Sequence, residues 1–422
     1  MITATFELVT PMFLGDANSQ STSLRPTSIK SEILFWWRSL RFGHLVDERS
    51  GDIGAALLEL HRIESALFGS PGTSLSLKGA SAPTDMVRAT QSKLSLSARW
   101  VKKSRQIDQF DADGEGIRYL GYGVVKTGRA SSSGRGRCHL ERTAFENGGQ
   151  FRVQVATRFV NEAELGYLEN AVRLMGLLGG LGARRRRGWG SLCLVDIEAP
   201  GGNDVERLFD KELQNIVAPL PATDARDFPL AAFGRGSSVH IWTEGFKHWT
   251  DAMESLGHGY QLYRSWGSAH SGYRFSGIES RKNFLGDHDW FRSGGLSPGK
   301  RPNLQTPKRA NLGLPLSFGK KTIDAAAPFA RRASPIMFHI AKVSGKFHPV
   351  ATHLDNAWLP EADERAGRPP PLLVTDSQEM PFQPDPTVVE NYFNGWQRTK
   401  PTERYSYFDG YEIDLSVRGD AR

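Results

Sequence analysis

Hydrophobic and polar residues alternate over the first positions of the chain. Ile2, Ala4, Phe6 and Leu8 fall on one face, and the residues between them are mostly polar. A period of two predicts a strand with one buried face over residues 2–9. A loop rich in Ser, Thr and Pro is expected to follow it over 11–26.

The pattern then changes to a helical period. Ser28 is a candidate N-cap for a helix running to Gly43, because a hydroxyl can accept from the first free amides. The predicted apolar stripe consists of Ile29, Ile33, Trp36, Trp37 and Leu40. Basic residues mark a second face of the same helix, namely Lys30, Arg38 and Arg41. The helix is therefore expected to have one core face and one basic face.

A second round of the same order follows. Alternation predicts strands over 92–100 and 151–159. Asn161 and Glu164 have the spacing of a capping box at the start of the next helix, and residues 191–198 predict a further strand. The order β–α–β occurs twice, which predicts a ferredoxin-like domain over 1–200.

The second half of the chain predicts a related domain. We interpret 201–235, with its proline breaks and one short helix, as a linker. Residues 236–422 carry a strand at Val239 and Ile241, a helix over 246–263, a strand over 334–343 and a late helix over 390–396. A basic and aromatic insertion is expected at 264–322. The predicted fold class is α+β, with two ferredoxin-like domains and long loop insertions.

Composition narrows the class of protein. Of 422 residues, 39% are hydrophobic and 23% charged, proportions that exclude a wholly disordered chain. Two cysteines exclude a disulfide framework and predict a reducing compartment. We see neither a leader sequence nor a membrane-spanning stretch, and we expect a cytoplasmic protein.

The charge is unevenly distributed. The chain carries 53 basic and 46 acidic residues, a net charge of +7. Residues 355–422 hold 13 acids and 7 bases, so this stretch is −6 and the other 354 residues are +13. Such asymmetry is typical of a polyanion-binding body with an acidic end, although ordinary solubility charge explains the net value equally well.

One sequence run carries the strongest functional signal. Residues 179–190 read Gly-Gly-Leu-Gly-Ala-Arg-Arg-Arg-Arg-Gly-Trp-Gly, between a predicted helix and a predicted strand. Glycine amides can line an anion site, arginines can neutralise phosphates, and an indole can stack on a base. The candidate RNA-binding residues are Lys30, Arg38, Arg41, Gly180, Gly182, Arg184, Arg185, Arg186, Arg187 and Trp189. The competing interpretation is a turn with a solvated charge cluster.

Other regions carry less chemistry. The insertion 264–322 interleaves basic and aromatic residues, a pattern shared by single-strand binders and protein-docking loops. Asp287-His288-Asp289 is the one tight acid–histidine group, and a loop explains it more simply. We find no metal-binding spacing and no nucleophile motif, and predict neither a catalytic residue, a metal nor a cofactor.

Several short motifs together are similar to one known family. They are Thr10–Gly15, Leu24–Lys30 with its Arg-Pro, Leu34-Phe-Trp-Trp-Arg38, Leu67–Gly69, Gly313–Gly319 and Arg332–Ile336. They resemble the first subunit of type III-B (Cmr) CRISPR effector complexes, within the RAMP superfamily. The run at 179–190 looks like the RAMP glycine-rich loop.

The resemblance implies a non-catalytic role in antiviral defence. Such a subunit would hold the 3′ region of the guide crRNA and the target RNA, beside other RAMP subunits of a ribonucleoprotein complex. The alternative is a metal-independent RAMP endoribonuclease that processes or cuts RNA. Asp16 or His44 would then activate the RNA 2′-hydroxyl. A pure protein–protein adaptor is the third hypothesis, and it would retain no RNA.

Overall fold

The structure is a computed structural model of the chain. It describes residues 1–16, 20–71, 73–74, 86–87, 89–126, 136–206, 208–264, 274–275, 278–279, 284, 287, 307–318, 321–326, 331–354, 356–358, 372–375, 378–394, 396–397, 404–405 and 408–416. Most of the expected insertion at 264–322, with His288 and Asp289, lies outside these residues. Within the described ranges, no helix is long and apolar enough to cross a membrane.

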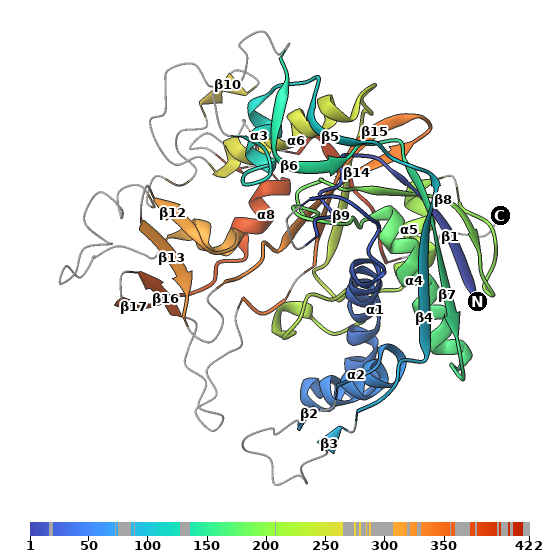
Figure 1. Ribbon diagram of the computed structural model, residues 1–422. Helices are drawn as coiled ribbons and strands as arrows, with labels where there is room; N and C mark the ends of the chain where they lie inside the picture. Colours follow the sequence, from blue (N-terminus) through green and yellow to red (C-terminus); the bar gives the residue numbers. More distant parts are fainter. Residues whose placement is uncertain are drawn as a thin grey trace.

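The first half of the chain builds an antiparallel sheet with helices on one face (Figure 1). Its strands are β1 (Ile2–Leu8), β4 (Leu94–Lys102), β7 (Gln150–Thr157) and β8 (Leu192–Glu198). They are ordered β4-β7-β1-β8, and every neighbouring pair is antiparallel. The crossover helices α1 (Pro26–Glu48) and α4 (Glu162–Leu177) pack against each other. This order is that of the split βαβ unit that the sequence predicts.

The first helix begins earlier than its sequence suggests. Its N-cap is Arg25, no side chain caps it, and Pro26 occupies the first turn. Proline suits this position because its fixed φ fits a helix and its missing N–H needs no partner. Ser28 is therefore not the cap, and that prediction is wrong. The predicted apolar stripe is buried as expected, and Asn161 caps α4 by accepting from the Glu164 amide at 2.8 Å.

The second half repeats the same topology. Its strands are β9 (Ser238–Trp242), β14 (Ile336–Val343), β15 (Lys346–His353) and β20 (Gly410–Glu412). Their order is β14-β15-β9-β20, again antiparallel throughout. In the sequence, helix α6 (Trp249–Arg264) lies between β9 and β14, and α8 (Thr387–Asn394) lies between β15 and β20. In both halves the sheet follows the order second, third, first, fourth, so the α+β fold class is confirmed.

Other helices and strands accompany these two sheets. Helices α2 (Ile53–Phe68), α3 (Glu115–Leu120) and α5 (Phe209–Val217) are accompanied by the 3₁₀ turns Ala225–Asp227 and Lys308–Leu312. β5 (Gln106–Phe110) pairs with β6 (Cys138–Phe145). A third sheet is ordered β12 (Leu316–Phe318), β13 (Lys321–Ala325), β16 (Leu372–Thr375) and β17 (Gln378–Pro381). Short pairs complete the set: β2 (Thr73–Ser74) with β3 (Met86–Val87), β10 (Arg274–Phe275) with β11 (Ile278–Glu279), and β18 (Trp396–Gln397) with β19 (Arg404–Tyr405).

The segment expected to be a linker packs on the first helix. The Phe228 ring lies edge-on to Phe42 with centroids 5.0 Å apart, and the Phe233 ring stacks on Trp36 at 6.5 Å. The Phe233 amide also donates to the Ser39 carbonyl at 2.8 Å. Residues 201–235 thus contribute to the hydrophobic core around α1. The domain limits at 200 and 236 stay a prediction.

The two sheets meet edge to edge. Strand β14 runs beside the end of the 179–190 run and the start of β8, with a parallel bridge between Arg187 and Phe338. The Phe338 amide donates to the Arg186 carbonyl, and the Gly188 amide donates to Phe338, both at 3.1 Å. Farther along, the Ile340 amide donates to Ser191 Oγ at 3.0 Å. The glycine–arginine loop is therefore part of the contact between the two sheets.

Candidate nucleic-acid interface

The glycine–arginine loop, residues 179–190, leaves the C-terminus of α4 and returns into β8. It packs on the segment after β1: the Ala183 amide donates to the Phe13 carbonyl and the Gly190 amide to the Pro11 carbonyl, both at 2.9 Å. Thr10 Oγ1 donates to the Gly188 carbonyl at 2.7 Å. Much of the loop backbone is thus bonded to protein.

The loop glycines serve this close packing. Gly190 has φ +66°, and a Cβ there would lie 2.0 Å from the Leu181 carbonyl oxygen. Gly182 has φ +90°, and its Cβ would lie 2.5 Å from the Phe13 carbonyl oxygen. Both positions require glycine for conformation and for space. The Gly180 amide faces Glu32 Oε1 at 3.4 Å, so the expectation that these amides form an open anion cradle is not met.

Trp189 belongs to the core. Its side chain is 0% exposed, and its ring makes edge-on or tilted contacts with Phe13, Phe110 and Trp249, with centroids 5.3–6.0 Å apart. The expectation of an open indole face is wrong, because aromatic side chains from both halves of the chain cover it. The ring therefore stabilises the junction and cannot stack on a base in this conformation.

A buried carboxylate anchors the loop to α1. The Glu32 side chain is 1% exposed and pairs with Arg185 Nη1 at 2.5 Å. Glu32 Oε1 also accepts from the Trp36 indole at 3.0 Å. Burial raises the pKa of Glu32, while the charge of Arg185 opposes this rise. Arg185 thus has a structural partner that it must retain, since removing one member of a buried pair leaves the other uncompensated.

Arg184 and Arg186 are placed differently. Arg184 is exposed, with φ +63°, and Arg186 lies over the Phe35 ring at 4.9 Å. Among the described residues, neither forms an ion pair with a carboxylate. Burial and the neighbouring Arg185 lower the pKa of Arg186 to about 10, and burial, Arg187 and Arg142 lower that of Arg184. These guanidiniums repel their neighbours, and a bound anion would relieve that repulsion.

An exposed aromatic ring lies beside Arg184. Tyr122 is 66% exposed, and the Arg184 guanidinium lies 6.0 Å from its ring centroid. Arg142 donates to the neighbouring Gly123 carbonyl at 3.4 Å, which places a further cation here. An exposed ring among cations is the arrangement that single-stranded nucleic acids use. We call Arg184, Arg186, Arg142 and Tyr122 the arginine-loop surface.

Arg187 points the other way. Its guanidinium lies 4.8 Å from the centroid of the buried Tyr260 ring, on α6, and 5.9 Å from that of Phe338. One of its nitrogens, Nη1, is buried and has no hydrogen-bond partner among the residues that the structure describes. Arg187 and Arg264 lower the pKa of Tyr260 to about 8 despite its burial. Arg187 is thus committed to the contact between the two sheets.

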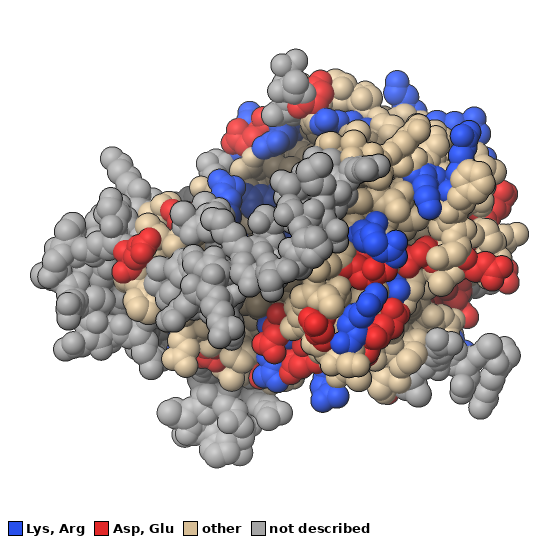
Figure 2. All heavy atoms as spheres, turned by 90° about the horizontal axis from the view of Figure 1, so that it is seen from below, with Lys and Arg blue, Asp and Glu red and all other residues tan. Residues whose placement is uncertain are grey.

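The predicted basic face of α1 is occupied by contacts within the protein. Lys30 Nζ donates to the Phe68 carbonyl at 2.6 Å, and Arg38 Nε donates to Glu64 at 2.6 Å. Arg41 is buried between Glu48, at 2.7 Å, and Glu164, at 3.2 Å. The structure does not bring these three side chains to the arginine-loop surface. Figure 2, seen from below, shows basic and acidic side chains interspersed rather than one patch of positive charge.

The candidate catalytic residues lie far apart. Asp16 is next to Gly15, whose carbonyl accepts from Arg25 at the start of α1. The Asp16 carboxylate accepts from the Gln20 amide at 3.0 Å, within a turn. His44 lies 18 positions after Pro26 on α1, about 27 Å along the helix. The two residues are therefore alternatives, and an endoribonuclease would use one of them as the activating base.

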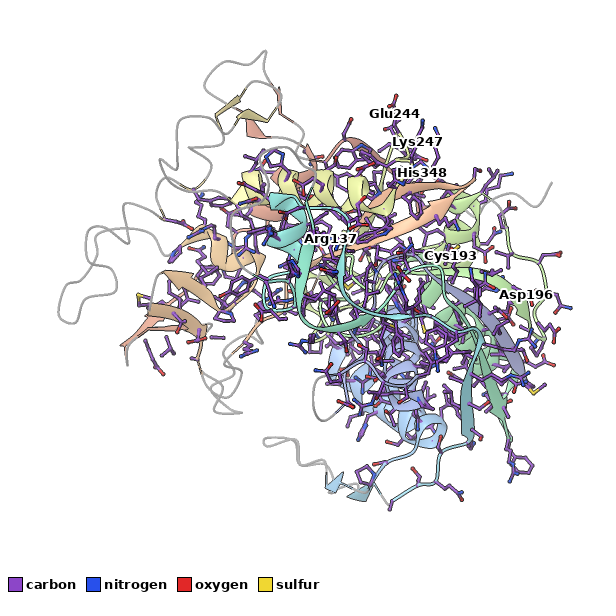
Figure 3. The ribbon with its side chains drawn as sticks, turned by 45° about the horizontal axis from the view of Figure 1, so that its top comes forward. Arg137, Cys193, Asp196, Glu244, Lys247 and His348 are labelled. Atoms are coloured by element: carbon purple, nitrogen blue, oxygen red, sulfur yellow. The ribbon has the colours of Figure 1, made fainter. Side chains whose placement is uncertain are left out.

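Burial or internal contacts surround several other titratable groups of the described residues. Within the described residues, no cluster of three or more His, Cys, Asp or Glu has a metal-binding arrangement. Figure 3 places Cys193 on β8 and shows Glu244, Lys247 and His348 gathered at another edge. Burial raises the pKa of Cys193 to about 11, and His348 Nδ1 lies 3.0 Å from the Trp242 carbonyl oxygen. Asp287 bonds to the Lys308 and Arg309 amides, a structural role.

Comparison with known families finds a similarity over the first part of the chain. The model of the RAMP superfamily matches residues 5–193, which contain β4, β7, α1, α4, the glycine–arginine loop and parts of β1 and β8. Residues 5–193 are therefore similar to the RAMP superfamily. Comparison with proteins of curated function gives no match.

Solved structures similar to the chain include CRISPR proteins. The crystal structure of Cmr1 from Pyrococcus furiosus in its apo form is 15% identical, covers 88% of this chain and 93% of its own, and has a TM-score of 0.47. A chain from the type III-B Cmr-beta complex bound to cognate target RNA is 11% identical, with coverage of 84% and 94% and a TM-score of 0.44. A chain of a type IV-B CRISPR complex covers 49% of this chain, with a TM-score of 0.27.

The sequence alone did not indicate some residues in and around the arginine-loop surface. Tyr122 and Arg142 lie in a glycine-rich stretch with no clear period, and only the fold brings them to Arg184. Glu32 is one acid in a helix, and nothing local indicates that it meets Arg185. An acid on the predicted apolar side of α1, one turn before Trp36, is the signal that could have found it.

Proposed function

We propose that this chain is a non-catalytic, RNA-binding RAMP subunit of a type III-B CRISPR effector complex, holding the 3′ region of the guide crRNA and the target RNA. The observation that carries the proposal is the arginine-loop surface, within the residues that the RAMP model matches: Arg184 lies beside the exposed Tyr122, Arg186 lies over the Phe35 ring, and neither pairs with a carboxylate among the described residues. The motifs at 10–15, 24–30 and 34–38 support the type III-B assignment. Partner subunits and a cytoplasmic location belong to the same proposal.

In this proposal the contacts give affinity without sequence readout. Arg184 and Arg186 bind phosphates, and Tyr122 stacks on a base. Phosphate contacts carry no sequence information directly, and stacking tolerates any base. Arg185, Arg187 and Trp189 hold the loop in place and touch no RNA. The endoribonuclease alternative rests on Asp16 or His44 acting alone; the Asp16 carboxylate accepts from the Gln20 amide within a turn, and the arginine-loop surface supports the RNA clamp.

The test is direct binding of labelled single-stranded RNA to the purified chain, by fluorescence anisotropy over a series of salt concentrations. Arg184→Ala with Arg186→Ala should weaken binding at least about tenfold and flatten the log–log salt slope by about 0.7 per lost contact. Arg158→Ala is the matched control. Arg158 is also exposed, but it precedes α4, about 24 Å of helix away from the loop.

The enzymatic alternative is tested on the same sample. Labelled RNA incubated with the chain, with and without Mg²⁺, should stay intact. Reproducible fragments that disappear in Asp16→Ala or His44→Ala would favour the endoribonuclease. Equal RNA affinity of the double-arginine variant and the Arg158→Ala control would remove the arginine-loop surface from the proposal. Absence of RNA binding by the parent chain at moderate salt would favour an adaptor.

A further inference from the structure

A large cleft lies between helix α2 and the second sheet. Its volume is about 1580 Å³, above the roughly 300–1,000 Å³ of ordinary small-molecule sites. Helix α2 forms one wall, and α8 with the segment 382–386 forms the opposite wall. The segment 224–238 and the sheet residues His240 and His353 complete the lining. The cleft is therefore of a size for a polypeptide segment.

The α2 wall presents apolar side chains to solvent. Leu57 is 36% exposed and Leu58 43% exposed, and both line the cleft. Ile53 and His61 lie one turn on either side of Leu57 and line it too. Residues at i, i+4 and i+8 share one helix face. Apolar side chains from α8 and its preceding loop, including Val389, Phe393 and Phe382, face the same space.

The charges around the cleft favour a cationic occupant. The lining includes four arginines and six carboxylates. Arg38 pairs with Glu64, Arg226 with Asp224, and Asp385 with Lys308. Arg235 lies near Asp224 and helps to lower its pKa, and Arg332 donates to the carbonyls of Trp358 and Ala333. Three carboxylates, those of Asp227, Glu390 and Glu412, form no ion pair with any described residue. Two of the lining histidines add no charge near neutral pH, because burial lowers the pKa of His240 and of His353 to about 4.

We propose that this cleft docks a basic amphipathic segment of a partner polypeptide. Apolar side chains of that segment would enter between α2 and α8, and its Lys or Arg side chains would meet Asp227, Glu390 and Glu412 at the rim. An apolar groove that receives an amphipathic helix is a recurring recognition mode. A net excess of carboxylates repels a phosphate backbone, so the cleft is a protein site and the arginine-loop surface is the RNA site.

The probe is a synthetic 18-residue helix of leucine and lysine, labelled for fluorescence anisotropy with the full chain. A leucine–glutamate helix of the same pattern is the charge control. The leucine–lysine helix should bind, and the leucine–glutamate helix should not. Leu57→Ser with Leu58→Ser should weaken binding at least about tenfold, because two apolar anchors are lost. Leu208→Ser is the matched control, since Leu208 is 55% exposed and lies outside the cleft lining.

Separate variants test the electrostatic contribution to binding of the leucine–lysine helix. Glu390→Gln with Glu412→Gln should weaken binding and flatten its salt dependence. Asp196→Asn with Glu198→Gln removes two exposed carboxylates of β8, which lies away from the cleft lining, and should change neither (Figure 3). Circular dichroism of each variant checks that it is folded.

Three results would overturn the proposal. They are equal binding of the two helices, equal affinity of the Leu57/Leu58 and Leu208 variants, and no binding of the leucine–lysine helix to the parent chain. Displacement of that helix by single-stranded RNA, with weaker RNA binding by the serine variant, would assign the cleft to RNA instead. The arginine-loop test does not depend on these results, so failure of one proposal leaves the other standing.

Discussion

The ion pair between Arg185 and Glu32 separates structural from RNA-binding arginines. Arg185→Ala would leave the Glu32 carboxylate, 1% exposed, without its 2.5 Å partner. Breaking a buried pair from one side costs about 3–5 kcal/mol. We expect the lower end, about 3 kcal/mol, because the Arg185 side chain is 28% exposed and Glu32 keeps its bond from Trp36.

Thermal unfolding measures this cost. For a domain of about 150–250 residues, each kcal/mol shifts Tm by about 2–4 °C, so Arg185→Ala should lower Tm by about 6–12 °C. Arg184→Ala is the control, because Arg184 is exposed and forms no ion pair with a described carboxylate. Its free energy of unfolding should change by no more than about 0.5 kcal/mol.

A double-mutant cycle and the pH dependence of stability test whether the lost ion pair causes this destabilisation. Glu32→Gln removes the buried charge, so Arg185→Ala should cost less in that background. Because the pKa of Glu32 is raised in the folded state, folding favours its protonated form. The stability that this protonated form contributes is lost as the pH rises above the ordinary pKa of 4.5. Losing Arg185 raises that pKa further, so the deficit should be larger at pH 7 than at pH 4.5. Equal Tm values for Arg184→Ala and Arg185→Ala would refute this reasoning.

Further predictions concern other residues of the first half of the chain. Trp189→Ala should lower the free energy of unfolding by about 3–5 kcal/mol in chemical denaturation, because it empties a core site; a folded variant of parental stability with weak RNA binding would restore the stacking role. Lys30→Ala with Arg38→Ala should leave RNA affinity within about twofold of the parent and cost at most about 1 kcal/mol per partly exposed contact, and a tenfold loss of affinity would return these residues to the site. Gly190→Ala should unfold at lower temperature than Gly166→Ala, since a Cβ meets a carbonyl at the first position and nothing within 4 Å at the second; equal melting would contradict the packing argument.

Local patterns predicted the elements whose buried residues recur with a regular period along the sequence. The strand at β1 and the helices α1 and α4 show clear alternation or an apolar stripe, and the structure has them within a few residues of the predicted limits. Strand β15 was missed because Pro349 interrupts it, and proline argues against an interior strand. Its hairpin signal, Ser344-Gly345, is present, and both residues have positive φ.

The candidate site was predictable only as a set of cations. Four consecutive arginines mark the loop, but their roles follow from partners that are distant in sequence: Glu32 for Arg185, Tyr260 for Arg187 and Tyr122 for Arg184. Lys30, Arg38 and Arg41 illustrate the opposite case. Their helical spacing is real, but α2 and α4 supply acceptors that the spacing alone does not reveal.

The edge-to-edge contact of the two sheets has a consequence for work with parts of this protein. β8 and β14 are outer strands of their own sheets, and each meets the other half of the chain through its backbone or flanking loop. Cutting the chain between residues 200 and 236 would uncover both edges, together with the rings around Trp189. Unpaired strand edges promote aggregation, so the separate halves should precipitate where the intact chain stays in solution, and co-expressing them should rescue both.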